Sequence, residues 1–231
     1  MPQSLIHVAV AHSPFREKFA IPRQPGLATA VRTRIELLPP YNKEEAIEGL
    51  EQVSHIWLLF LFHGVGSCPD TLRVRPPRLG GNERIGVFAS RSTHRPNGIG
   101  QSVVRVERIE GTDIWVSGAD LLDGTPIIDI KPYVPYSDVP PHAINTIAPA
   151  APEPCDVNWT EEALQASQQQ AARLSEPVTE VISQCLAQDP RPAYQSHDPQ
   201  REYGVRLWDL NVTWCYPQPQ TVLVRSVTPC D

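Results

Sequence analysis

Short runs in which apolar and polar residues alternate dominate the first 135 positions of the chain. Their β-branched and aromatic residues, separated by prolines and glycines, are typical of strands joined by turns. The most apolar run, SHIWLLFLFH at Ser54–His63, is short and aromatic, which favours a strand covered on both faces over a helix. The pattern predicts an all-β barrel or sandwich with strands at Leu27–Leu38, Ser54–His63, Ile85–Ala89, Gln101–Ile109, Ile114–Gly118 and Ile127–Tyr133.

One short helix interrupts this β pattern. Asn42 and Glu45 have the spacing of a capping box, in which both side chains accept hydrogen bonds from amides of the first turn. Ala46, Ile47 and Leu50 then fall on one helical face, so we expect a helix that ends near Gln52.

The pattern changes after residue 135. Residues 136–158 are rich in proline and alanine, which predicts a linker or an arm laid over a neighbour. Strict alternation from Trp208 to Trp214 predicts a strand with one buried face, paired with Thr221–Val227. The remaining elements are helices at Glu161–Leu174 and Glu176–Gln188, with Thr160 and Ser175 as N-caps. The chain is therefore predicted as a barrel domain at 1–135, a linker at 136–158 and a small α+β domain at 159–231.

Composition restricts the class of protein. The chain has 231 residues, 41% hydrophobic and 20% charged, as in soluble globular proteins, and its longest apolar run, Ile56–Phe62, is too short to span a membrane. The N-terminal MPQSLIHVAV lacks the basic leader of a signal peptide. Five scattered cysteines without a CxxC pair argue against disulfides and zinc, so we expect a cytoplasmic protein without a metal.

Charge is distributed unevenly. Residues 1–150 hold 15 basic and 15 acidic side chains, whereas residues 151–231 hold 5 and 11 and account for the net charge of −6. The segment Arg73–Arg108 contains eight arginines and only two glutamates. Such a basic surface can recruit the phosphates of a nucleic acid, although a set of arginines that merely face water is an equal alternative. The candidate RNA-binding residues here are Arg73, Arg75, Arg78 and Arg95.

A polar loop at Ser90–Gly100 separates two of the predicted strands. Pro96 restricts the backbone of Arg95, while Gly98 and Gly100 permit a positive φ or a close approach by another group. A loop of about a dozen donor-rich residues on rigid supports is typical of a binding loop, and a decorated surface loop is the alternative.

Three enzyme classes lack their motifs in this chain. There is no GxxxxGK[ST] phosphate loop, no GxGxxG after a strand and no GxSxG elbow. Polar loops at strand ends instead offer arginine for a carboxylate, main-chain groups for a base edge and Asp123 for an amine or ribose. A ligand that combines an amino acid with a nucleoside fits these groups.

The same loops resemble the TsaA-like (TrmO) family of tRNA methyltransferases. One departure is Gly98, where the family more often has proline. The matching segments are Ile85–Arg91, Arg95–Asn97, Ile99–Gly100, Asp120–Pro126, Asp129–Tyr133, and, as in longer bacterial members, Asp189–Tyr194 and Arg201–Gly204.

This resemblance implies a single-sheeted β-barrel that binds S-adenosylmethionine and works as a homodimer. It implies methylation of the exocyclic amine of threonylcarbamoyl-adenosine beside the anticodon of a threonine tRNA. By position, the cofactor residues are Arg23, Gln24, Pro25, His63, Gly64, Arg91, Gln101, Leu121, Leu122, Asp123 and Gly124.

The resemblance does not identify a general base. Asp123, Tyr133 or the carboxylate of the substrate itself can accept the proton that the amine loses. Arg191 and Tyr194 lie on a proline-stiffened loop, where they can contact RNA while the barrel holds the cofactor, or merely seal the two domains together. A non-catalytic RNA- or nucleoside-binding module is the alternative function.

Overall fold

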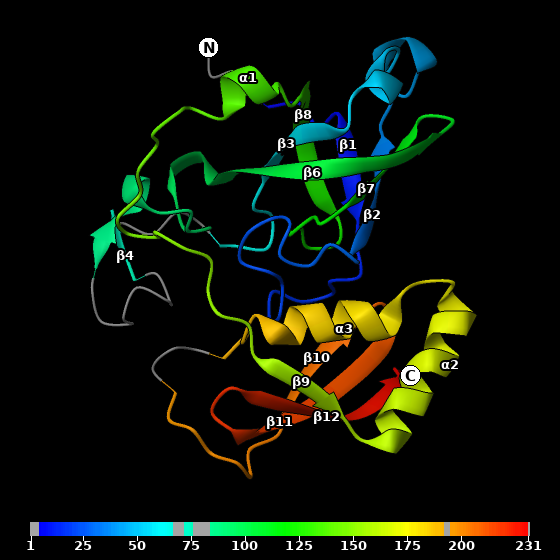
Figure 1. The fold of residues 1–231 in the computed structure, drawn as a ribbon. Coiled ribbons are helices and arrows are strands. Elements are labelled where there is room, and N and C mark those ends of the chain that lie inside the picture. Colours follow the sequence, from blue (N-terminus) through cyan, green and yellow to red (C-terminus); the bar gives the residue numbers. More distant parts are fainter. Residues whose placement is uncertain (1–4, 67–71, 76–83, 192–194, 231) are drawn as a thin grey trace.

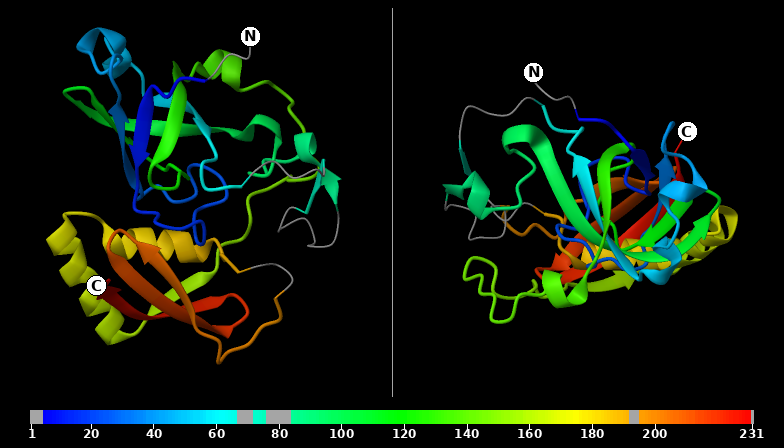
Figure 2. Two further views of the ribbon diagram at one scale, coloured as in Figure 1. Left: turned by 180° about the vertical axis from the view of Figure 1, so that it is seen from behind. Right: turned by 90° about the horizontal axis from the view of Figure 1, so that it is seen from above.

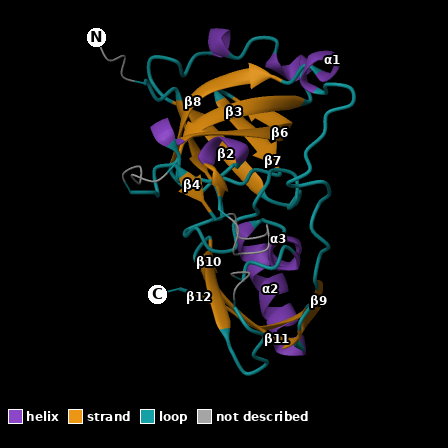
Figure 3. Ribbon diagram, turned by 90° about the vertical axis from the view of Figure 1, so that its left-hand side faces the viewer, coloured by secondary structure: helices purple, strands orange, loops and turns teal. Residues whose placement is uncertain are grey.

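The structure is a computed structural model that describes residues 5–66, 72–75, 84–191 and 195–230. A closed β-barrel forms the first part of the chain, and a second sheet with two helices forms the last part (Figure 1). Viewed from the side, the strands of the barrel and the two helices occupy opposite ends of the molecule (Figure 3). The predicted fold class, mainly β with a single-sheeted barrel followed by a small α+β unit, is confirmed.

Six antiparallel strands close the barrel in the order β1-β2-β7-β6-β3-β8. Closure leaves no strand edge unpaired, which is how a small sheet protects its main-chain groups from other chains. The strands are β1 (Ala9–His12), β2 (Arg32–Leu37), β3 (His55–Leu61), β6 (Ile99–Glu110), β7 (Asp113–Ser117) and β8 (Thr125–Pro132).

The central strand β3 shows how the sequence pattern builds the barrel. Ile56, Leu58 and Phe60 are buried in the interior of the barrel, while Trp57 and Leu59 point outward and remain half-buried. The predicted strand is therefore confirmed, and its outward face is covered only in part.

Gly100 on β6 shows why the polar loop needs its glycines. A Cβ atom at this position would lie 2.5 Å from Cζ of Phe60, whose ring packs edge-on against Phe62. Gly98 has a φ of +59°, which neither proline nor most L-residues adopt. The loop therefore follows a path that a proline at position 98 would forbid.

Three local predictions about the first part of the chain are wrong. The predicted helix that ends near Gln52 is two separate 3-10 turns, Glu44–Ala46 and Leu50–Gln52, because Gly49 between them takes a φ of +86°. The strand predicted from Leu27 begins only at Arg32, since the preceding residues turn away from the barrel. The strand predicted at Ile85–Ala89 is only β5 (Ile85–Gly86), because Val87–Ala89 forms a 3-10 turn. β5 pairs with β4 (Arg73–Val74) in a small hairpin, and a further 3-10 turn lies at Pro96–Gly98.

An arm connects the barrel to the second sheet. It begins with the single-turn helix α1 (Pro135–Asp138), continues without regular structure, and ends in strand β9 (Asp156–Trp159). Seen from behind, this segment runs along the outside of the molecule (Figure 2). The ends of the predicted linker thus carry a helical turn and a strand.

The C-terminal unit is a four-stranded sheet of order β10-β11-β12-β9, in which β9 runs parallel to β12. The predicted helix at Glu161–Leu174 is confirmed as α2, and Thr160 caps it by accepting a hydrogen bond from the Ala163 amide. Ser175 is the left-handed C-cap of α2, with a φ of 56°, so its predicted role as the next N-cap is wrong. The other elements are α3 (Val178–Ala187), β10 (Tyr203–Leu207), β11 (Leu210–Gln218) and β12 (Thr221–Pro229).

Two hydrophobic cores hold the chain together. One fills the barrel, and the other is formed by the second sheet and its helices. The second core also contains Phe15, Ala20, Ala28 and Val31, which belong to the segment between β1 and β2. This segment lies between the barrel and α3 (Figure 1), so it joins the two units.

Candidate active site

The predicted cofactor loops meet at one end of the barrel. In an antiparallel barrel, the end of one strand lies beside the start of its neighbour. This end gathers the ends of β1, β3 and β7 with the starts of β2, β6 and β8. The topology therefore brings together four segments that are far apart in the sequence: residues 13–31, 62–64, 90–98 and 118–124.

Arg91 and Gln24 contact each other directly at this end of the barrel. The Arg91 Nη1 atom donates to the Gln24 side-chain oxygen over 2.5 Å, although the two residues are 67 positions apart. Just beyond Pro25, the Gly26 amide donates to the Gly118 carbonyl over 2.8 Å and fixes the loop against the end of β7. The exposed Arg91 guanidinium is thus oriented by a polar neighbour and open to an anionic ligand.

His63 and Gly64 lie beside the segment 121–124. A Cβ atom on Gly64 would lie 3.0 Å from both Leu122 Cδ2 and Lys18 Cε, so these three residues are close neighbours. A Cβ atom on Gly124 would lie 3.9 Å from His63 Nε2. Lys18 is a cation at this site that sequence reasoning missed, because nothing in its local pattern distinguishes it from a solvated lysine.

Asp123 holds the neighbouring loop in place. Its Oδ1 atom accepts from the Ser13 amide at 3.0 Å, and its Oδ2 atom forms an ion pair with Arg16. Its own amide donates to the Phe15 carbonyl at 2.9 Å. Leu121 is buried in the barrel, and its carbonyl accepts from the Ser13 hydroxyl. Both carboxylate oxygens of Asp123 are therefore engaged, which favours a structural role over that of a general base.

Asp120 is a better candidate than Asp123 for the general base, and sequence reasoning did not select it. The Ser102 hydroxyl on β6 donates to its Oδ1 atom at 2.5 Å. Burial raises the pKa of Asp120 to about 6, against the opposing effects of the Ser102 hydrogen bond and the Arg91 charge. No sequence pattern distinguishes Asp120 from Asp123, since the burial arises only when the barrel closes.

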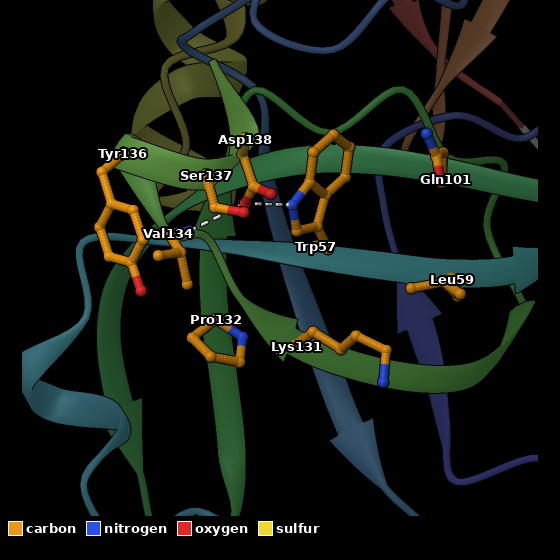
Figure 4. Close-up of a pocket in the computed structure, with 9 residues that line it drawn as sticks. All are labelled: Trp57, Leu59, Gln101, Lys131, Pro132, Val134, Tyr136, Ser137 and Asp138. Carbon is orange, nitrogen blue, oxygen red and sulfur yellow. Dashed lines mark hydrogen bonds between the residues drawn. The ribbon is translucent and has the colours of Figure 1, made fainter. Parts of the chain in front are cut away.

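Gln101 lies on the outer face of the barrel. Its neighbours Gly100 and Ser102 point inward, whereas Gln101 borders a groove of about 490 Å³. Figure 4 shows Gln101 at one end of this groove and Tyr136 at the other, with the Trp57 indole hydrogen-bonded to Asp138. Gln101 is thus near the candidate site along β6, but on a different face.

Tyr133 lies at the opposite end of the barrel. Its amide donates to the His55 carbonyl at the start of β3, whereas His63 follows the end of that strand. A seven-residue strand is about 20 Å long. Within one copy of the chain, Tyr133 therefore lies away from this end of the barrel, and its role as the base stays a prediction.

Arg191 is engaged within the C-terminal unit. Its guanidinium pairs with Asp189 at 2.8 Å, lies 3.6 Å from the centre of the Tyr216 ring and donates to the Pro219 carbonyl. Its side chain is only 12% exposed. Its carbonyl accepts from Arg23 at 3.4 Å, which connects it to a predicted cofactor residue. This geometry favours the sealing role over contact with RNA.

The other candidate RNA-binding residues differ in exposure. Arg73 and Arg75 are exposed on and beside β4, and Arg73 donates to the Arg84 carbonyl. Arg95 is half-buried and donates to the Ser90 carbonyl, which closes the polar loop. Arg78 and Tyr194 lie outside the described residues.

The class of protein also depends on whether the chain could hold a metal or cross a membrane. The described part of the chain contains no group of three histidine, cysteine or acidic side chains that could hold a metal. No helix there has the length and apolar run that a membrane crossing needs. Cys155, Cys185, Cys215 and Cys230 are free thiols, and Cys68 lies outside the described residues.

A closed antiparallel barrel with arginine, amide and acidic side chains at one open end is typical of a protein that binds a small polar ligand there. Comparison with known proteins narrows this class. The model of the tRNA-methyltransferase O N-terminal domain matches residues 10–139, and that of the TrmO C-terminal domain matches residues 152–230. The chain belongs to the tRNA-methyltransferase O family.

Individual relatives agree with this assignment. The chain is 43% identical to the Escherichia coli protein named tRNA (adenine(37)-N6)-methyltransferase, over 90% of both chains. It is 58% identical, over the whole of both chains, to a Pseudomonas aeruginosa protein named "Putative S-adenosylmethionine-dependent methyltransferase RcsF". The crystal structure of TrmO from Pseudomonas aeruginosa is similar with a TM-score of 0.86 at 53% identity, over 99% of both chains.

Proposed function

We propose that this chain transfers a methyl group from S-adenosylmethionine to the exocyclic N6 amine of adenosine 37 in tRNA. The finer proposal is that the acceptor is threonylcarbamoyl-adenosine beside the anticodon of a threonine tRNA. A tRNA substrate implies action in the cytoplasm. The observation that carries the proposal is the direct contact of Arg91 with Gln24 at the barrel end, in a chain whose relatives are named for this reaction.

The residues at this barrel end suit S-adenosylmethionine. The exposed Arg91 can pair with the carboxylate of its amino-acid part, and Gln24 and main-chain groups of the segment 121–124 can hydrogen-bond its polar atoms. Leu122, beside His63 and Gly64, offers an apolar surface for the nucleoside. When bound, the cofactor supplies a reactive sulfonium methyl group, so the protein's task is alignment and exclusion of water.

The methylated amine must lose a proton. An acylated exocyclic amine is a weak nucleophile, so a proton acceptor close to it accelerates the reaction. Among the acids at the barrel end, Asp120 has a pKa of about 6 and is ionised at neutral pH while remaining near the range in which it can accept a proton. The carboxylate of the threonylcarbamoyl group itself is the second candidate.

The tRNA is proposed to lie across the hairpin of β4 and β5, next to the polar loop. Arg73, Arg75 and Arg84 are exposed there, so their guanidinium groups can contact phosphates. Arg105 and Arg108, at the far end of β6, pair with Glu107 and Glu110 on their own strand. Because the arginines at the far end of β6 are paired on their own strand, the exposed arginines of the hairpin are the better candidates for the RNA surface.

A homodimer is proposed for the apolar arm. Tyr136, Val139 and Ile144 are 93%, 60% and 86% exposed, and Tyr136 also borders the groove with Trp57. A run of exposed large apolar side chains is expected where another chain covers them. Sedimentation velocity should show a dimer that Tyr136→Glu weakens, whereas a wild-type monomer at all concentrations would contradict this proposal.

The test of the proposed function is a pair of measurements on the full-length protein. Calorimetry should show binding of S-adenosylmethionine, and incubation with tRNA should transfer one labelled methyl group. Binding of both ligands without transfer would favour the alternative, a non-catalytic RNA- or nucleoside-binding module. An absence of cofactor binding would contradict the proposed function altogether.

A further inference from the structure

The loop between β1 and β2, residues 13–31, makes contacts on two sides. One side contacts the candidate site, where Lys18 lies against Gly64, Gln24 meets Arg91 and Gly26 bonds to Gly118. The other side contacts the C-terminal unit. In Figure 1 this blue loop runs between the barrel and α3. The placement of Gln24 therefore depends on what lies behind the loop.

Apolar side chains of the loop lie in the core of the C-terminal unit. Phe19 stacks on Trp214, with ring centres 5.8 Å apart and an interplanar angle of 13°. Phe15 forms an isolated β-bridge with Leu207 and is fully buried. Because Phe19 follows Lys18 directly, one dipeptide joins the candidate site to the core of the second unit.

Hydrogen bonds fix the main chain of the loop on the same side. The Trp208 amide donates to the Pro14 carbonyl over 2.7 Å, and the Arg206 amide donates to the Glu17 carboxylate over 2.7 Å. At the far end of the loop, the Ala30 amide donates to the side-chain oxygen of Gln184 on α3 over 2.8 Å. The loop is thus held at both ends by the C-terminal unit.

Backbone strain supports the same conclusion. Ala20 has a φ of 64°, a left-handed conformation that is unfavourable for a residue with a Cβ atom. Its side chain is 5% exposed and belongs to the C-terminal core. Such a conformation persists where surrounding contacts impose it. The second unit therefore determines the shape of the loop as well as its location.

We infer that the C-terminal unit is a clamp that holds residues 13–31 in the cofactor-binding conformation, with Gln184 and Trp214 as positioning residues. This inference rests on the proposed cofactor site at the barrel end. It differs from a division of labour in which the barrel alone binds the cofactor and the C-terminal unit only selects the tRNA. Affinity for the cofactor then depends on residues that never touch it, because only the ordered loop binds.

The test compares two substitutions of Gln184. Gln184→Met has a similar size but no strong acceptor for the Ala30 amide, whereas Gln184→Glu keeps an acceptor oxygen. Loss of one hydrogen bond changes an equilibrium by up to about tenfold, so the dissociation constant for S-adenosylmethionine should rise about three- to tenfold in Gln184→Met. It should stay within about twofold of wild type in Gln184→Glu. In turnover assays, KM for the cofactor should rise in Gln184→Met while kcat at saturating cofactor stays unchanged.

A matched control separates positioning from general stability. Thr160→Ala removes the N-cap of α2, on the C-terminal unit but away from the loop, and should lower Tm by about 2–4 °C with no change in cofactor affinity. Phe19→Ala is the second variant. It should weaken cofactor binding, whereas Thr160→Ala should lower Tm without weakening cofactor binding.

The outcomes distinguish the two levels of the argument. If the wild-type protein does not bind S-adenosylmethionine, the proposed function fails. If the wild type binds and both Gln184→Met and Phe19→Ala bind equally well, the clamp is overturned. An equal loss of affinity in Thr160→Ala would also overturn it, because affinity would then follow stability alone. If either loop-facing variant does not fold, the other decides the matter.

Discussion

Replacement of Asp120 by asparagine should stabilise the protein and impair methyl transfer. Burial raises the pKa of Asp120 from 3.8 to about 6, so the ionised side chain is less favourable in the folded than in the unfolded state. The asparagine side chain would be uncharged, and its carbonyl oxygen could still accept the Ser102 hydrogen bond. A substitution that stabilises the fold while it damages the reaction is expected of a residue retained for function.

The pH dependence follows from the raised pKa. Below about pH 4 the carboxyl is protonated in both states, so its ionisation costs nothing. The cost grows between about pH 4 and pH 6 and is complete above pH 6. A shift of about two units corresponds to about 3 kcal/mol, but Asp120 keeps part of its solvent contact, so we expect a gain of about 1–2 kcal/mol in Asp120→Asn at pH 7.5.

Thermal unfolding and turnover assays test this reasoning together. At pH 7.5 the Tm of Asp120→Asn should exceed that of wild type by about 2–8 °C, and at pH 4 the difference should vanish. Methyl transfer should fall about a hundredfold or more if Asp120 accepts the proton. Asp123→Asn is the control: it loses the Arg16 ion pair and should lower Tm. A Tm for Asp120→Asn below that of wild type at pH 7.5 would refute the account of its burial.

Three further predictions concern other parts of the site and the barrel. Arg91→Ala should weaken binding of S-adenosylmethionine about ten- to a hundredfold, because a charge-assisted hydrogen bond contributes about 1.5–3 kcal/mol; unchanged affinity in calorimetry would remove Arg91 from the site. Gly100→Ala should cost at least about 2 kcal/mol in the free energy of unfolding, since the new Cβ atom would lie 2.5 Å from Phe60 Cζ; denaturant unfolding at wild-type stability would contradict this close contact. Removal of basic side chains from the hairpin region should weaken tRNA binding and flatten its salt dependence, and an unaltered salt slope would mean that they only face solvent; the substitutions are Arg73→Ala, Arg75→Ala and Arg78→Ala.

Much of the fold is predictable where local pattern and tertiary packing agree. The helix Glu161–Leu174 follows from its amphipathic pattern and the Thr160 cap, and the strand at Ser54–His63 follows from its apolar run. The pattern fails where residues pack outside their own unit. Ala28 and Ala30 alternate with Thr29 and Val31 along the sequence, as in a strand. Ala28 and Val31 are nevertheless both buried in the C-terminal core, because their segment turns. Trp208 continues an alternating run but takes a φ of 53° in the turn between β10 and β11, and sequence reasoning did not predict β10.

The candidate site likewise has features that the sequence predicts and features that it does not. Polar loops at strand ends can be selected from the sequence, and the barrel topology brings together those of Gln24, His63 and Arg91. The burial of a side chain and the direction of a strand cannot be predicted from the sequence in this way. Asp120 acquires its raised pKa only inside the closed barrel, and Tyr133 is at the wrong end of a strand whose direction the sequence alone does not give.

The most direct test of the proposed function is nucleoside analysis of threonine tRNA after incubation with the purified protein and S-adenosylmethionine. Two matched tRNAs should be compared, one carrying threonylcarbamoyl-adenosine beside the anticodon and one with unmodified adenosine there. We expect one added methyl group on the threonylcarbamoyl-adenosine and none on the unmodified tRNA. Methylation of the unmodified tRNA alone would contradict the proposed substrate, and the absence of product from both tRNAs, with cofactor and tRNA bound, would contradict the proposed catalysis.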